Sequence, residues 1–223
     1  MIYLKSNDVL LFQGDSITHG GRIESDEDLN HVIGHGYQDT VAQRLGVDNI
    51  ERMPRIENRA VSGDQIEKIT ARAERDIFAI KPTIMSILDG SNEASSYIDG
   101  RSDITSEKFN RLFRALLDDM KARLPGIRFI ICQPWRYVCA GAEDQKREKQ
   151  IAELTEVNIG IVREVARDYG AIYVPFKDAL DSYMKYCPQD HLVWDGDHPT
   201  YTGHGILADC WLKTVEAEWG TEK

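Results

Sequence analysis

Nucleophilic, basic and acidic side chains occur in this chain in short clusters that lie far apart in the sequence. Ser16 stands in LLFQGDSITHGG, and His198 stands near the other end of the chain in WDGDHPTYTGHG. A serine hydroxyl, a histidine and a nearby carboxylate are the groups that nucleophilic acyl transfer requires. Glycine and asparagine, which offer N–H donors to an oxyanion, occur in two further clusters, NRAVSGD and LDGSNE. These residue types together indicate acyl transfer.

The elements that must position these clusters are visible as apolar runs. Five runs predict strands, namely DVLLFQG, IENRAVSG, TIMSILDG, IRFIICQP and AIYVPF. Between them, apolar residues recur with the helical period of 3.6, as over 109–124 and 151–169, and a last helix is expected over 201–219 with Thr200 as its N-cap. This alternation predicts an α/β protein, a three-layer α/β/α sandwich with a five-stranded, mostly parallel sheet. No linker or repeat interrupts it, so residues 1–223 are expected to form a single domain.

The clusters follow the strands at the edge where open α/β sheets bind their ligands, outside the carboxyl ends of the strands. Ser16 comes after the first strand, Gly63 after the second and Asn92 after the third. Asp195 and His198 come after the last strand. The predicted architecture therefore brings a nucleophile, a base, a carboxylate and N–H donors to one rim.

On these blocks the chain resembles the GDSL-type members of the SGNH hydrolase superfamily, which is named for Ser, Gly, Asn and His. By this resemblance FQGDSIT makes Ser16 the nucleophile, and NRAVSGD makes Gly63 a main-chain donor to the oxyanion. LDGSNE makes the Asn92 amide another donor. DGDHPTYTGH makes His198 the base and Asp195, three residues earlier, its carboxylate. The order and wide spacing of the blocks match over essentially the whole chain.

The resemblance implies a flavodoxin-like SGNH hydrolase fold and a serine esterase that works through a Ser-His-Asp triad and an acyl-enzyme, with no metal and no cofactor. The oxyanion hole would consist of the N–H groups of Ser16 and Gly63 and the Asn92 amide. Short acyl groups, acetyl above all, are expected on a small or carbohydrate ester, because similar bacterial chains are often polysaccharide acetylesterases. One departure stands out: the family's third block usually reads Gly-x-Asn-Asp, whereas this chain has Glu93, whose extra methylene would shift the hydrogen bonds of the loop.

Each candidate residue also has a purely structural interpretation. Ser16 would be a good helix cap, Gly63 a turn residue with positive φ, and Asn92 a loop-former through an Asx turn. Asp195 and Asp197 both lie near the histidine in sequence, and only the family spacing favours Asp195. The triad assignment rests on all the blocks together.

Other aromatic and histidine residues are secondary candidates. Trp135 and Trp194 flank the rim residues, where they either pack in the core or line an acyl or sugar pocket. His31 and His35 have the i,i+4 spacing of a zinc pair, but the glutamate of H-E-x-x-H is missing and the neighbouring glycines indicate a loop. No metal is expected there.

Composition excludes several classes of partner. The net charge is −10 and no basic cluster with interleaved aromatics occurs, so no nucleic acid is expected. No run approaches the roughly 20 apolar residues of a membrane span, and MIYLKSNDVLLFQG lacks the apolar region of a signal peptide, so a cytoplasmic protein is expected. The four cysteines (Cys132, Cys139, Cys187 and Cys210) show no C-x-x-C spacing and are expected as free thiols. Nothing in the sequence specifies an oligomeric state.

Three rival functions remain open at this level. One is a lysophospholipase- or thioesterase-type acylhydrolase, although the polar, glycine-rich segments after the rim blocks favour short acyl groups. Another is a metal-dependent phosphoesterase built on Asp15, Asp195, Asp197 and His198. The third is a non-catalytic binding module on the same fold.

Overall fold

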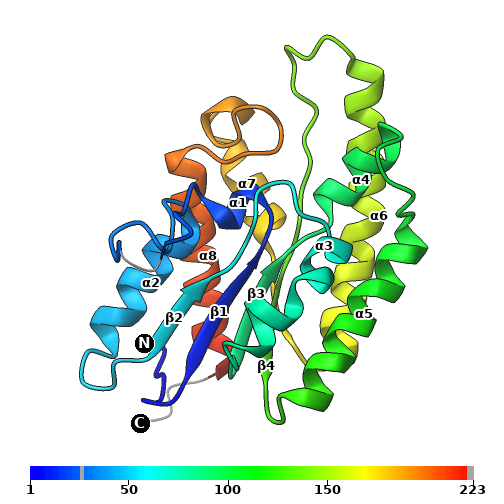
Figure 1. Cartoon of the computed structure of the whole chain (residues 1–223). Helices are drawn as coiled ribbons and strands as arrows, with labels where there is room; N and C mark the ends of the chain where they lie inside the picture. Colours follow the sequence, from blue (N-terminus) through cyan, green and yellow to red (C-terminus); the bar gives the residue numbers. More distant parts are fainter. Residues whose placement is uncertain (26–27, 220–223) are drawn as a thin grey trace.

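The five apolar runs form one sheet, in which all neighbouring strands are parallel and the order is β2-β1-β3-β4-β5 (Figure 1). The computed structural model describes residues 1–25 and 28–219. The strands are β1 (Val9–Gly14), β2 (Arg55–Asn58), β3 (Ile84–Leu88), β4 (Arg128–Cys132) and β5 (Ile172–Val174). The strand order reverses between β1 and β3, and such a switch point is where open α/β sheets bind ligands.

Helices connect the strands and cover both faces of the sheet. They are α1 (Ser16–His19), α2 (Tyr37–Asp48), α3 (Ile66–Ala71), α4 (Ser91–Ile98), α5 (Ser106–Arg123), α6 (Gln145–Tyr169), α7 (Phe176–Met184) and α8 (Tyr201–Trp219), with a π-helical turn η1 (Glu74–Phe78) and a 3₁₀ turn η2 (Gln189–His191).

Successive strand residues point to opposite faces of the sheet, so each strand contributes to two cores. Leu10 and Phe12 of β1 pack in the core formed with α2, α7 and α8, whereas Leu11 packs in the core formed with α3, α5 and α6. Figure 1 shows these two groups of helices on opposite sides of the sheet. The predicted three-layer α/β/α sandwich is therefore confirmed, and every strand pairing is parallel.

Local signals account for several helix ends. Thr200 Oγ1 accepts a hydrogen bond from Gly203 N at 3.2 Å, which confirms Thr200 as the cap of α8. Thr105 Oγ1 accepts from Lys108 N in the same way at the start of α5. Helix α6 ends at Gly170, whose φ of 62° is the left-handed conformation that glycine adopts without strain.

The strands are shorter than the apolar runs suggested. The second run was predicted to continue toward Gly63, but β2 ends at Asn58. The chain beyond β2 still lies along β1, because Arg59 N donates to Phe12 O at 3.0 Å and Val61 N donates to Gly14 O at 3.1 Å. This contact carries the second block to the carboxyl end of β1.

Two further expectations concern the chain as a whole. All four cysteines are free thiols; Cys132 is buried and the other three are partly exposed. Within residues 1–25 and 28–219, no helix combines the length and apolarity needed to cross a membrane.

Candidate active site

Ser16 lies where β1 turns into α1, at the carboxyl edge of the sheet. Asp15 caps this helix, since its Oδ1 accepts a hydrogen bond from Ile17 N at 3.0 Å. Gly14 permits the turn, because its φ is 143° and a Cβ there would lie 2.3 Å from Leu88 O. As the first residue of α1, Ser16 has no intrahelical partner for its N–H. The hydroxyl and the main-chain N–H of Ser16 therefore both lie at the junction of β1 and α1.

Ser16, His198 and Asp195 form a continuous chain of hydrogen bonds. Ser16 Oγ lies 2.8 Å from His198 Nε2, and His198 Nδ1 lies 2.7 Å from Asp195 Oδ2. A carboxylate only accepts, so Nδ1 carries the proton and Nε2 is left as the acceptor for the serine hydroxyl. This is the tautomer that a general base needs.

Asp195 also shapes the loop that carries His198. Its Oδ1 accepts hydrogen bonds from the main-chain N–H groups of Asp197 at 2.9 Å and His198 at 2.7 Å. Burial alone would raise the pKa of Asp195, but the hydrogen bonds from His198 and Asp197 outweigh it and bring the pKa to about 2. The hydrogen bond with Asp195 in turn raises the pKa of His198 above its usual value.

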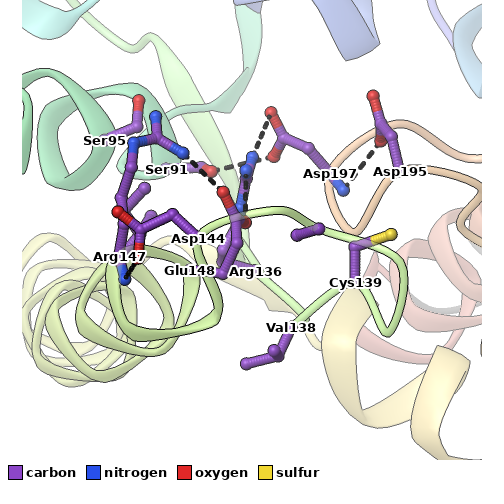
Figure 2. Close-up of polar contacts among 12 residues, drawn as sticks. Ser91, Ser95, Arg136, Val138, Cys139, Asp144, Arg147, Glu148, Asp195 and Asp197 are labelled. Atoms are coloured by element: carbon purple, nitrogen blue, oxygen red, sulfur yellow. Dashed lines mark hydrogen bonds and ion pairs between the residues drawn. The ribbon is translucent and has the colours of Figure 1, made fainter.

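Asp197, the alternative partner of the histidine, faces elsewhere. Its Oδ1 accepts from Ser91 Oγ at 2.9 Å and its Oδ2 lies 3.2 Å from Arg136 Nη1. Arg136 Nη2 donates to Glu148 Oε2 at 2.8 Å, so the guanidinium lies between two carboxylates (Figure 2). These two carboxylates outweigh the effect of burial and raise the pKa of Arg136. Of the two aspartates, Asp195 is therefore the one that contacts the imidazole. Asp197 belongs to a polar network that connects the histidine loop to α4.

Gly63 and Asn92 lie on adjoining segments. Asn92 Nδ2 donates to Asp64 O at 3.0 Å, which orients the amide and leaves its second N–H for another acceptor. The φ of Gly63 is 76°, and a Cβ built there would meet no atom within 4 Å. Conformation, rather than space, therefore favours glycine here. The carbonyl of Gly63 accepts from Lys68 Nζ at 3.1 Å.

The two tryptophans take different positions. Trp135 has no exposed surface, and its Nε1 donates to Asp197 O at 2.9 Å. Its role is therefore support of the histidine loop from the core, and it offers no surface to line a pocket. Trp194 is 61% exposed and stacks on His198, with ring centroids 6.3 Å apart. It also borders a hollow of about 420 Å³ formed with residues 138–141 and 188–190.

The other histidines lie outside this relay. His204 Nδ1 accepts a hydrogen bond from Tyr37 N at 3.1 Å, at the start of α2. Burial, followed by the charge of His198, lowers the pKa of His204 to about 4, so it is neutral near pH 7. His31 lies 2.7 Å from Asp28 and its ring is 5.3 Å from that of His35. In the part of the chain that the structure describes, no group of three or more His, Cys, Asp or Glu side chains has a metal-binding arrangement.

Sequence reasoning missed the contribution of the segment after β4. Arg136 and Trp135 both hold Asp197, from its side chain and its main chain. The rule that ligands bind outside the carboxyl ends of the strands applies to β4 as well as to β1 and β3. Gln133-Pro134-Trp135-Arg136 was therefore detectable as a further rim segment.

Comparison with known proteins agrees with this arrangement. The model of the GDSL-like lipase/acylhydrolase family matches residues 12–206. An acetylxylan esterase of Geobacillus stearothermophilus is 29% identical over 220 residues, which cover 96% of each chain. A protein of Parabacteroides merdae described as a GDSL-like lipase superimposes with a TM-score of 0.89 at 29% identity, over 96% of this chain and 98% of the other. A variant of Axe2, an acetylxylan esterase of G. stearothermophilus, gives a TM-score of 0.82 at 26% identity, over 95% and 96%.

Fold and family together define the protein as a carboxylic ester hydrolase. The chain belongs to the GDSL-like lipase/acylhydrolase family.

Proposed function

We propose that the chain is a serine esterase that removes short acyl groups, acetyl above all, through an acyl-enzyme. The observation that carries this proposal is the unbroken relay of Ser16, His198 and Asp195, with contacts of 2.8 and 2.7 Å. The N–H groups of Ser16 and Gly63 and the free N–H of Asn92 form the oxyanion hole.

In the first half-reaction His198 Nε2 takes the proton of Ser16 as Oγ attacks the ester carbonyl. Asp195 stabilises the imidazolium that forms. The proton then passes to the leaving alcohol, and the C–O bond to that alcohol breaks. In the second half-reaction His198 activates a water that attacks the acyl-enzyme, and the proton returns to Ser16 as the acid leaves.

The acetyl preference is supported by the similarity to an acetylxylan esterase of Geobacillus stearothermophilus, in both sequence and structure. The alcohol part is proposed to be a carbohydrate. Trp194 presents 61% of its surface beside the catalytic histidine, and an exposed indole is a suitable platform for the apolar face of a sugar ring. The hollow of about 420 Å³ next to it provides room for further sugar units.

The test is a series of esters of one alcohol with acyl groups from acetyl to octanoyl, together with labelling by a serine-directed phosphonate. We expect kcat/KM to be highest for acetyl and the phosphonate to attach to Ser16. A steady rise toward octanoyl would indicate the lysophospholipase or thioesterase type instead, since each buried CH₂ contributes about 0.8 kcal/mol where an apolar slot exists. Loss of activity on chelation with Ser16→Ala still active would indicate a metal-dependent phosphoesterase. Absence of both labelling and hydrolysis would indicate a binding module.

A further inference from the structure

Two carboxyl groups lie buried beneath the candidate active site. Asp89 directly follows β3 and is 2% exposed, and Glu93 lies in the first turn of α4 and is 1% exposed. Neither forms an ion pair with a residue that the structure describes. Two adjacent buried carboxylates without a cation are strongly unfavourable, because desolvation and mutual repulsion act together.

The contacts of the two groups are unequal. Glu93 Oε1 accepts a hydrogen bond from Ile66 N, the first residue of α3, at 2.7 Å. Glu93 Oε2 and both carboxyl oxygens of Asp89 have no hydrogen-bond partner within the normal geometric limits among the described residues. The two carboxyl groups face each other in the protein interior, and a hydrogen bond between them can form only when one of them carries a proton.

The surroundings favour a proton on Asp89. Burial, followed by repulsion from Glu93 and Asp15, raises the pKa of Asp89 far above its usual value. Asp15 faces the pair from the end of β1, and burial followed by repulsion from Asp197 raises its own pKa to about 7. His198, on the loop before α8, is the basic group that faces Asp15.

We propose that Asp89 and Glu93 share a single proton and together act as positioning residues for the oxyanion hole. Asp89 donates its carboxyl O–H to Glu93 Oε2, so the pair carries one negative charge in place of two. This inference rests on the proposed esterase function of the neighbouring residues.

The pair positions two of the proposed oxyanion donors through one set of hydrogen bonds. Glu93 holds α3 at Ile66, Asn92 Nδ2 holds Asp64 O at 3.0 Å, and Gln65 Nε2 donates to Asn92 O at 3.3 Å. These three hydrogen bonds join the segment of Asn92 to the segment that follows Gly63. An aspartate in place of Glu93 would be one methylene too short for the same reach. Glu93, which stands where the family's third block usually has aspartate, is therefore the residue that completes this set of hydrogen bonds.

The experiment compares Asp89→Asn with Asp89→Leu. The asparagine amide can donate to Glu93 Oε2 at every pH and cannot ionise, whereas leucine leaves Glu93 Oε2 without a donor. For a small acetate ester we expect Asp89→Asn to retain kcat within about twofold. Asp89→Leu should lose kcat by about 10- to 100-fold with KM little changed, because misplacement of a donor by about 1 Å has effects of this size. Asp103→Asn, on an exposed carboxylate paired with Lys108, is the control.

Infrared spectroscopy supplies a second readout that does not depend on activity. At a pH above the pKa of Asp15, the infrared spectrum of the wild type should show the carbonyl band of one protonated carboxyl group. The spectrum of Asp89→Asn should lack this band. The spectrum decides the question even if Asp89→Leu does not fold. Equal kcat for Asp89→Asn and Asp89→Leu, or absence of the band in the wild type, would overturn the proposal. Failure of the esterase assignment would appear differently, as an active Ser16→Ala enzyme with the infrared band intact.

Discussion

The indole of Trp194 stacks on the imidazole of His198, with ring centroids 6.3 Å and planes 28° apart. One tryptophan thus contacts the proposed general base and also presents most of its surface to solvent. Under the proposed function, this position makes Trp194 the candidate for contact with the alcohol part of the substrate.

Trp194→Ala should therefore discriminate between substrates. Burial of a sugar face on the ring contributes about 1–2 kcal/mol, so KM for an acetylated xylo-oligosaccharide should rise about 5- to 30-fold. KM for a small acetate ester should change little. Steady-state kinetics on both substrates is the measurement, with Tyr3→Ala, before the amino end of β1, as the control. Equal increases in KM for both substrates would contradict a role in carbohydrate binding.

Ser16→Ala and His198→Ala should each reduce kcat by about 10⁴–10⁶, and the double variant should lose little more. The reason is that the two side chains act as one unit through the 2.8 Å contact between Oγ and Nε2. Kinetics of the two single variants and the double variant tests this. If the losses of kcat in the single variants added up in the double variant, the two residues would act independently, and the triad assignment would be wrong.

The decrease of activity at low pH should follow the protonation of His198. The imidazole must be neutral to accept the serine proton, and its pKa is raised above the usual value for histidine, chiefly by the hydrogen bond with Asp195. Activity should therefore fall as the pH decreases through this raised value. In Asp195→Asn the carboxylate is absent, so the midpoint should move to lower pH, and the plateau kcat should fall by about 10⁴. A midpoint that stays in place would mean that Asp195 does not set the basicity of His198.

Asn92→Ala should lower kcat by about 10²–10³ and leave KM for a neutral ester nearly unchanged. An oxyanion donor acts on charge that develops only in the transition state, which is why the effect falls on kcat. Ser95→Ala, one turn further along α4, is the comparison variant. If KM rose instead and kcat were retained, Asn92 would be a substrate-binding residue.

Arg136→Met should destabilise the fold and impair catalysis together. The substitution leaves the Asp197 and Glu148 carboxylates without their shared cation, and breaking a buried pair of this kind lowers the free energy of unfolding by about 3–5 kcal/mol. Denaturant unfolding gives this value, and kcat reports on the histidine loop that Asp197 holds. The exposed Arg167→Met should cost less than about 1 kcal/mol. If Arg136→Met lowered the free energy of unfolding by a similarly small amount, the network would not contribute to the stability of the fold.

Much of the fold was predictable because its signals are local. Continuous apolar runs such as that of β1 and the 3.6-residue period of α5 follow from the chain's own spacing. Caps such as Thr200 need only a partner three residues away. The strand ends were less predictable, since β2 stops at Asn58 although its contacts with β1 continue to Val61. Where a ladder ends depends on the neighbouring strand, which lies elsewhere in the sequence.

For the candidate site, the sequence by itself determined which residue types stand at the ends of β1, β3 and the last loop. Only the tertiary structure decided which of them meet: Asp195 contacts His198, whereas Asp197 is held by Arg136, some 60 positions away. It also decided that Trp135 is buried while Trp194 is exposed, and that Asp89 lies against Glu93. The physical reason is that hydrogen bonds, ion pairs and desolvation depend on the groups that packing brings within a few ångströms. Sequence spacing does not specify those neighbours.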